Sequence, residues 1–99
     1  MGPDGHTASL FPNHPILNND DELVTFIKDS PKPPAERVTL TMKTINQTKH
    51  KIVIATGESK STIIKEILID KNEIYPIGQV KNLIWFIDQL AASKLSLQQ

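Results

Sequence analysis

The 99-residue sequence contains no cysteine, so it has neither a disulfide framework nor a thiolate nucleophile. Lysine and arginine together number 11, as do aspartate and glutamate, and this balance does not suggest a nucleic-acid or membrane partner. No run of about 18 or more apolar residues occurs, so the sequence predicts no transmembrane helix. We therefore expect one small domain with no nucleic-acid or membrane partner. The absence of cysteine fits a reducing compartment, and we expect a cytoplasmic location.

The densest chemistry lies in the first few residues. Gly2 and Gly5 permit backbone angles that other residues resist, and Pro3 fixes its own φ. Asp4 and His6 are one residue apart, so a turn here can hold a carboxylate near an imidazole. Imidazole exchanges protons near neutral pH, which suits it to general-base catalysis. The simpler alternative is a polar turn that leads into a short helix.

Two segments resemble a known family. Residues 2–12, Gly-Pro-Asp-Gly-His-Thr-Ala-Ser-Leu-Phe-Pro, closely resemble the signature of the 6-phosphogluconolactonases. The related glucosamine-6-phosphate deaminases share Asp-Gly-His here but then diverge. Residues 30–41 resemble the same family, with Ser-Pro-Lys-Pro-Pro followed by Arg-Val-Thr-Leu-Thr. By composition alone, this proline-rich stretch is also compatible with a linker or a Pro-x-x-Pro ligand.

The resemblance covers nearly the whole chain but only the C-terminal part of the family's domain. It implies an α/β fold with a partial doubly wound, mostly parallel sheet and flanking helices. Residues 1–99 are then the C-terminal portion of a larger Rossmann-like domain. The family's N-terminal half, with the first parallel strands and a further phosphate-binding loop, has no counterpart in the sequence. We therefore expect a fragment or a truncated gene model that is inactive in isolation.

Apolar patterning favours an α/β fold independently of the resemblance. Residues 51–55 form the clearest strand, and its uninterrupted apolar run indicates burial on both faces. A turn and an apolar stripe of helical spacing at residues 58–69 follow, which together make an α/β unit. The remaining pattern predicts strands at 23–27, 37–40 and 83–87, helices at 42–48 and 89–95 capped by Thr41 and Asp88, loops at 13–22 and 70–82, and a tail at 96–99.

The first segment supplies the candidate catalytic residues. As the resemblance implies, His6 is the base that draws a proton from the attacking water. Asp4 either orients the His6 tautomer or hydrogen-bonds its own loop as an Asx turn, and the sequence leaves both open. Backbone N–H groups around Gly2, Gly5 and Thr7, leading into a helix N-terminus, are candidates for binding an anion of the substrate.

Two cations are candidate phosphate ligands. Lys60 lies in a Gly-x-x-Lys turn between a buried strand and a helix, where anionic ligands bind open α/β sheets. The resemblance implies a phosphate contact for it, because the deaminase relatives use their lysine in that way. Arg37 matches the arginine that follows the family's proline-rich loop and suits a bidentate phosphate contact. Pairing of Arg37 with Glu36 is the alternative.

The resemblance implies hydrolysis of 6-phosphogluconolactone to 6-phosphogluconate in the oxidative pentose phosphate pathway. The small-molecule partner is then a sugar-phosphate lactone, and no cofactor is required. Asp4, His6 and His14 are conceivable metal ligands by residue type, but the family needs no metal and we expect none. One alternative is a deaminase or isomerase acting on an amino-sugar phosphate. Another is a non-catalytic fragment or partner-binding remnant. The sequence does not indicate an oligomeric state.

Overall fold

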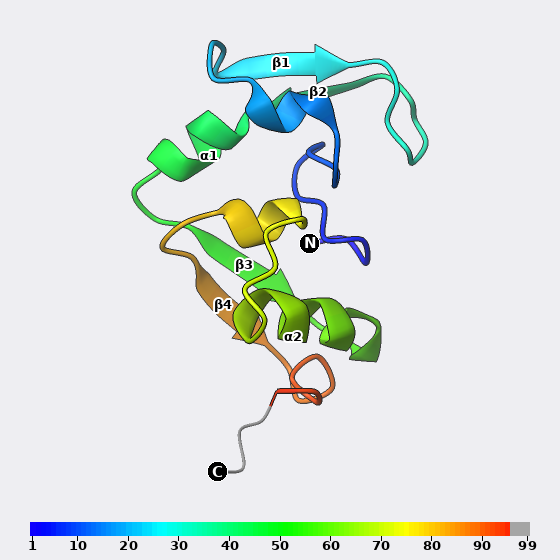
Figure 1. Ribbon diagram of the computed structural model, residues 1–99, viewed down its shortest axis with the longest axis vertical. Helices are drawn as coiled ribbons and strands as arrows, with labels where there is room; N and C mark the ends of the chain where they lie inside the picture. Colours follow the sequence, from blue (N-terminus) through cyan, green and yellow to red (C-terminus); the bar gives the residue numbers. More distant parts are fainter. Residues whose placement is uncertain (96–99) are drawn as a thin grey trace.

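The computed structural model describes residues 1–95 as an α/β arrangement of two small sheets with short helices between them (Figure 1). The first sheet lies toward one end of the long axis of the molecule, and the second lies nearer the other end (Figure 1). The N-terminal segment runs between them. The expected α/β class is therefore confirmed, while the tail predicted at 96–99 lies outside the described residues.

The first sheet pairs β1 (Val24–Ile27) with β2 (Arg37–Leu40) in antiparallel register, with Phe26 opposite Val38. Both strands were predicted from their apolar, β-branched runs. The antiparallel pairing was not expected within a mostly parallel sheet. It follows from the proline-rich loop between the strands, which reverses the direction of the chain.

The second sheet contains the predicted α/β unit. β3 (Ile52–Ala55) pairs in parallel with β4 (Ile84–Ile87), so that Ala55 is opposite Ile87. Between them, a 3₁₀ turn at Glu58–Lys60 leads directly into α2 (Ser61–Leu68). The apolar face of α2 covers one side of β3, and this packing confirms the helical stripe predicted from the sequence.

Short helices lie in the connections between the strands. α1 (Met42–Gln47) begins after Thr41, whose hydroxyl accepts a hydrogen bond from the Thr44 N–H at 3.3 Å, as predicted for an N-cap. The two predicted loops each contain a 3₁₀ helix, at Pro15–Asn18 and Pro76–Gln79. Among the described residues, no helix has the length and hydropathy needed to cross a bilayer.

Residues 89–95 do not form the predicted helix. The segment is a run of turns in which the Ala92 N–H bonds to the Asp88 carbonyl, but the Ser93 and Leu95 N–H groups each bond only three residues back. Asp88 still caps the segment, because its carboxylate accepts a hydrogen bond from the Ala91 N–H at 2.8 Å. Only Ala91 in this segment is fully buried, so too little apolar packing is available to hold a regular helix.

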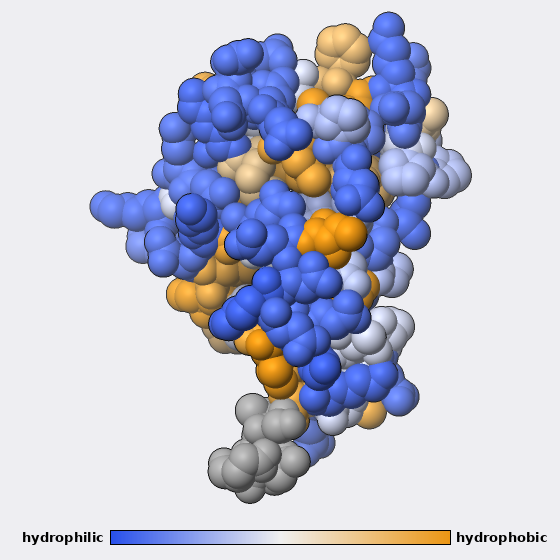
Figure 2. Space-filling view, in the orientation of Figure 1, coloured by the Kyte–Doolittle hydropathy of each residue, from blue (hydrophilic) through white to orange (hydrophobic). Residues whose placement is uncertain are grey.

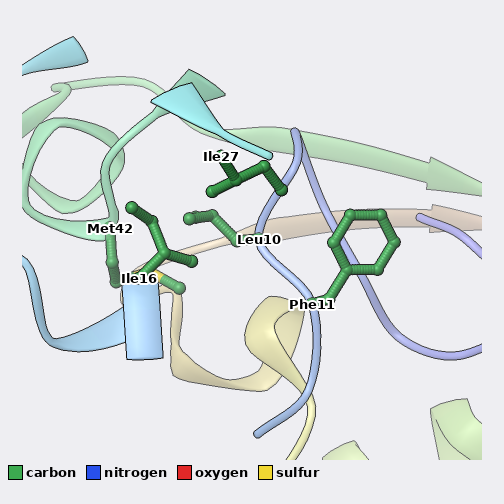
Figure 3. Packing of buried hydrophobic residues seen from close by; sticks show 5 residues of the cluster. All are labelled: Leu10, Phe11, Ile16, Ile27 and Met42. Atoms are coloured by element: carbon green, nitrogen blue, oxygen red, sulfur yellow. The ribbon is translucent and has the colours of Figure 1, made fainter. Parts of the chain in front are cut away.

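The core is divided among three clusters of buried side chains. One joins the N-terminal segment to β1 and α1 and contains Leu10, Phe11, Ile16, Ile27 and Met42 (Figure 3). The other two lie between α2 and the second sheet, and they include Val53, Ile64 and Ile67. Leu10 and Phe11 are almost completely buried. The segment with the densest polar chemistry is therefore anchored by the residues that directly follow it.

The prediction that β3 is buried on both faces is wrong. Its burial alternates, and Ile54 is 69% exposed. Apolar side chains reach the surface in several places among polar ones (Figure 2). Four of them form an exposed face on the second sheet, and four more do so on the first: Ile52, Ile54, Ile84 and Phe86, and Val24, Phe26, Val38 and Leu40. Within residues 1–95, each sheet is covered on one side only.

Candidate functional site

The first six residues fold into a tight turn that holds Asp4 against His6. The Asp4 carboxylate oxygen Oδ1 lies 2.5 Å from His6 Nδ1 and also accepts a hydrogen bond from the His6 backbone N–H at 3.2 Å. The turn is closed by the Gly2 N–H, which donates to the His6 carbonyl at 2.9 Å, and by the Gly5 N–H, which donates to the Gly2 carbonyl. The sequence spacing of Asp4 and His6 predicted that a turn could bring them together, and their side chains are in direct contact.

Two glycines are needed for this shape. A side chain at Gly2 would collide with the His6 imidazole at Cε1 and Nδ1, so the ring lies directly over the Gly2 backbone. Gly5 has a φ of +83°, a left-handed conformation that favours glycine, and a Cβ there would be 2.6 Å from Tyr75 Cδ1. The Gly5 carbonyl accepts a hydrogen bond from the Ile77 N–H at 3.2 Å. The turn is therefore fixed on its outer side by the segment that follows α2.

Replacing Gly2 by alanine is expected to push the imidazole away from Asp4. The added methyl group occupies the space of the ring, so the ring must rotate and the Asp4–His6 hydrogen bond breaks. Nitrogen-detected NMR of the His6 ring is expected to show loss of the bonded Nδ1–H signal. Any hydrolytic rate that depends on His6 should fall about 100-fold, the usual cost of a displacement of about 1 Å. Pro3→Ala, at an exposed neighbour in the same turn, is the control, and an unchanged His6 signal in the Gly2 variant would contradict the prediction.

Phe11 joins His6 to Arg37. The His6 and Phe11 rings are stacked, with centroids 4.6 Å apart and an interplanar angle of 28°. The Arg37 guanidinium carbon lies 5.3 Å from the Phe11 centroid, a favourable cation–π distance. A buried aromatic ring thus brings a residue at the start of β2 close to the N-terminal turn.

Arg37 is also occupied by the proline-rich loop. Its Nε donates to the Pro34 carbonyl at 3.1 Å, and its Nη2 donates to the carbonyls of Lys32 and Pro33 at 3.1 and 2.9 Å. The structure therefore shows carbonyl partners for Arg37 and not the pairing with Glu36 considered above. A phosphate contact would have to use the remaining N–H groups of the guanidinium, which carries five donors in all.

The Asp4 carboxyl is held in its ionised form. Burial by itself would raise the pKa of Asp4, but the hydrogen bonds from the His6 ring and backbone outweigh burial and lower that pKa. An ionised Asp4 can only accept a hydrogen bond, so this contact selects the His6 tautomer whose proton is on Nδ1. This leaves the lone pair on Nε2 free to act as a base.

This shift makes the stability of the turn depend on pH. Because the pKa of Asp4 is lowered by folding, its contribution is fully present above the ordinary carboxyl pKa of 3.8 and is lost as the pH falls through the folded-state pKa. We expect the free energy of unfolding of wild type to exceed that of Asp4→Asn near pH 5. The difference should shrink toward zero in more acidic solution. Urea unfolding at several pH values measures it, with exposed Asp21→Asn as the control, and a gap independent of pH would contradict the prediction.

The backbone N–H groups proposed for anion binding are engaged inside the turn. Those of Gly2, Gly5 and His6 bond to the turn itself, and that of Thr7 bonds to the Leu10 carbonyl at 3.3 Å. Thr7 and Leu10 form a β-bridge, so no helix N-terminus follows the turn. An anion would have to displace these bonds to reach the N–H groups.

Lys60 ends the 3₁₀ turn at Glu58–Lys60, directly before α2, as its position in the sequence indicated. Burial, and after it the charge of Lys60, lower the pKa of the Met1 amino group. Met1, which begins the turn that carries Asp4 and His6, packs on the cluster that contains Ala55, and Ala55 ends β3 shortly before the turn that carries Lys60. Met1 also packs on the other core cluster of the second sheet. The candidate base and the candidate phosphate ligand thus lie at the same end of that sheet.

His14 forms a second histidine–aspartate pair that the sequence did not indicate. Its Nε2 lies 2.8 Å from Asp29 Oδ1, and its Nδ1 accepts a hydrogen bond from the Ile16 N–H at 3.0 Å. Both ring nitrogens are therefore used to cap the 3₁₀ helix and attach it to the end of β1. In residues 1–95, no three His, Cys, Asp or Glu side chains are grouped in a way that could hold a metal ion.

Tyr75 is the supporting residue that sequence reasoning missed. Its hydroxyl donates to Glu66 of α2 at 2.8 Å, and its ring lies against Gly5. α2 therefore supports the His6 turn through Tyr75. Because α2 begins directly after Lys60, the same helix contacts both parts of the candidate site. The only sequence signal was an aromatic residue before a proline in a polar loop.

Comparisons with known proteins agree with this architecture. Residues 1–85 match the family model described as glucosamine-6-phosphate isomerases/6-phosphogluconolactonase. The chain is 46% identical to rat 6-phosphogluconolactonase and 49% identical to a probable 6-phosphogluconolactonase of Arabidopsis thaliana. These matches cover 98% and 96% of this chain but 39% of each relative. The chain thus spans about two fifths of the length of the relatives it matches.

Solved structures give the same result. The 6-phosphogluconolactonase of Trypanosoma brucei superposes with a TM-score of 0.75 at 33% identity, covering 97% of this chain and 40% of that one. The 6-phosphogluconolactonase of Thermotoga maritima gives a TM-score of 0.74 at 35% identity, covering 88% of this chain and 39% of that one. Since the family model spans most of the chain, this protein belongs to the glucosamine-6-phosphate isomerase/6-phosphogluconolactonase family.

Proposed function

We propose that the chain carries the hydrolytic site of a 6-phosphogluconolactonase, which converts 6-phospho-D-glucono-1,5-lactone to 6-phospho-D-gluconate. The observation that carries this proposal is the 2.5 Å contact between Asp4 and His6 Nδ1. It leaves His6 Nε2 as a base, in a turn whose order of residues resembles the lactonase signature. The relatives named above are lactonases, and they support the same substrate class.

The reaction follows from ordinary ester chemistry. His6 Nε2 takes a proton from water while the water oxygen bonds to the lactone carbonyl carbon. The bond from that carbon to the ring oxygen then breaks, and the protonated His6 returns its proton to the departing oxygen. Asp4 keeps Nδ1 protonated and stabilises the imidazolium between the two steps. His6 both takes and returns the proton, so the two proton transfers balance without a cofactor.

In this proposal Lys60 binds the substrate phosphate. Lys60→Ala is expected to raise KM about 10- to 100-fold with little change in kcat, the usual cost of losing a charge-assisted hydrogen bond. Initial rates over a range of lactone concentrations measure this. Lys65→Ala, which removes a lysine of α2 that pairs with Asp70, is the matched control. An unchanged KM would remove Lys60 from the site.

A substrate panel tests the function itself. The purified chain is assayed beside a chimera in which residues 1–99 replace the matching segment of the rat relative. The substrates are 6-phosphogluconolactone, gluconolactone and glucosamine 6-phosphate, and rates are counted above spontaneous lactone opening. Turnover of the phosphorylated lactone alone supports the proposal, whereas turnover of the amino sugar would favour a deaminase or isomerase.

A second candidate is partner binding without catalysis. It is favoured by the exposed apolar faces of the two sheets, including Ile54 and Phe86. The absence of a hydrolysis rate above background in both the chain and the chimera would support this candidate.

A cytoplasmic location is also a proposal. Two rice relatives are named chloroplastic, so cell fractionation is needed to check the location of this chain.

A further inference from the structure

We infer that Asp88 is a positioning residue that holds the Gly57–Lys60 turn in the shape that presents Lys60 to the substrate phosphate. This inference rests on the proposed function, because it assigns Asp88 a role in the same phosphate site. Asp88 acts on the turn through the backbone N–H of Gly57.

The contact joins the ends of the two parallel strands. β3 ends at Ala55 and β4 ends at Ile87, and these residues are partners in the register. Asp88 follows β4 directly, and its Oδ1 and Oδ2 lie 3.1 and 3.3 Å from the Gly57 nitrogen, whose N–H donates to them. The carboxylate therefore ties the loop after β4 to the loop after β3, at the edge of the sheet where ligands bind in open α/β folds.

Gly57 is held by a hydrogen bond to a residue outside its own turn. Its φ of +94° belongs to the region that favours glycine, and the 3₁₀ turn that it precedes has no side-chain cap. Apart from its chain neighbours, no atom of the described residues lies within 4 Å of the position where a Gly57 side chain would project. The turn is thus open on the face where that side chain would lie, which leaves room for a ligand. Asp88 holds the turn through the backbone N–H of Gly57. The Gly57 carbonyl accepts the Lys60 N–H at 3.2 Å, so the position of Gly57 sets that of Lys60.

The same carboxylate has a second partner. Oδ1 also accepts the Ala91 N–H at 2.8 Å. The hydrogen bonds from Ala91 and Gly57 lower the pKa of Asp88, so the group is an anion that faces N–H donors. Oδ1 accepts both the shorter of the two hydrogen bonds from the Gly57 N–H and the hydrogen bond from the Ala91 N–H. A single asparagine oxygen in the place of Oδ1 can therefore keep these two bonds. Alanine can keep neither.

The test measures binding of 6-phosphogluconate and of gluconate to the 99-residue chain by NMR titration. Wild type is compared with Lys60→Ala, Asp88→Ala, Asp88→Asn and the double variant Asp88→Ala/Lys60→Ala. Lys94→Ala is the control, since it frees the same C-terminal turns from Thr62 of α2 without touching Gly57. Urea unfolding midpoints verify that each variant is folded.

If Asp88 acts through Lys60, Asp88→Ala weakens 6-phosphogluconate binding about tenfold, Asp88→Asn restores most of it, and Lys94→Ala leaves it unchanged. The double variant then binds no more weakly than Lys60→Ala alone, because the two residues form one unit. Binding of gluconate, which lacks the phosphate, is unchanged throughout.

Each other outcome is decisive. Additive losses in the double variant, or equal losses for gluconate, would show that Asp88 only supports the fold. A loss with Lys60→Ala but none with Asp88→Ala overturns the role of Asp88 and leaves the phosphate site intact. Equal binding by wild type and Lys60→Ala, or no binding by wild type, overturns the proposed phosphate site and the inference together.

Discussion

Replacing His6 by alanine is expected to lower the rate of lactone hydrolysis about 10²- to 10⁴-fold, the usual contribution of a general base. The His6 ring has one nitrogen bonded to Asp4 and is stacked on Phe11, so its orientation is fixed before substrate binds. Alanine removes the base but leaves the Gly2–Gly5 hydrogen bond of the turn in place. The loss should therefore appear in kcat rather than in KM.

His14→Ala is the matched control for this experiment. His14 also contacts an aspartate, but both of its ring nitrogens are occupied, because Nδ1 caps a 3₁₀ helix and Nε2 contacts Asp29. We expect the rate to stay within about twofold of wild type. Both variants are measured in the purified chain and in the rat chimera, with spontaneous lactone opening subtracted. A His6→Ala variant that keeps the full rate would remove His6 from catalysis.

Replacing Phe11 by alanine is expected to destabilise the fold by about 3–5 kcal/mol, the range for removing a buried aromatic ring. Phe11 is 1% exposed and lies in the cluster that joins the N-terminal segment to β1 and α1. The substitution leaves a cavity and also removes the surface on which His6 and Arg37 rest. Urea unfolding followed by fluorescence measures the loss.

Phe11→Leu separates packing from stacking. Leucine keeps much of the apolar volume, so we expect a smaller loss of stability than with alanine. It has no aromatic ring, so the His6 ring should lose order in both variants. Equal unfolding free energies for wild type and Phe11→Ala would show that the segment is not anchored through this ring.

Local patterns predicted much of this structure. The strands, α2 and the Thr41 cap follow from apolar runs and short-range hydrogen bonding, which are encoded within a few residues. Contact between Asp4 and His6 was predictable for the same reason, because the two residues share one turn. Most features set by neighbouring residues were recovered in this way. The helix predicted at 89–95 was not, because too little of that segment is buried.

Features that depend on distant segments were not predictable. Arg37 meets Phe11 and the Lys32–Pro34 carbonyls only after the chain reverses between β1 and β2. Tyr75 reaches Gly5 across the length of the chain. The apolar run of β3 was correctly read as a strand, but burial depends on what covers it, and no local pattern reports that.

The uncovered sheet faces change how a common test of foldedness should be read. Dyes such as ANS fluoresce on exposed apolar surface, and that signal is widely used to identify molten globules. Here apolar side chains such as Phe26 and Phe86 are exposed on ordered strands, so the native chain itself should brighten the dye. Near-UV circular dichroism of Trp85, which packs against the core, separates the two states because only a fixed ring gives that signal.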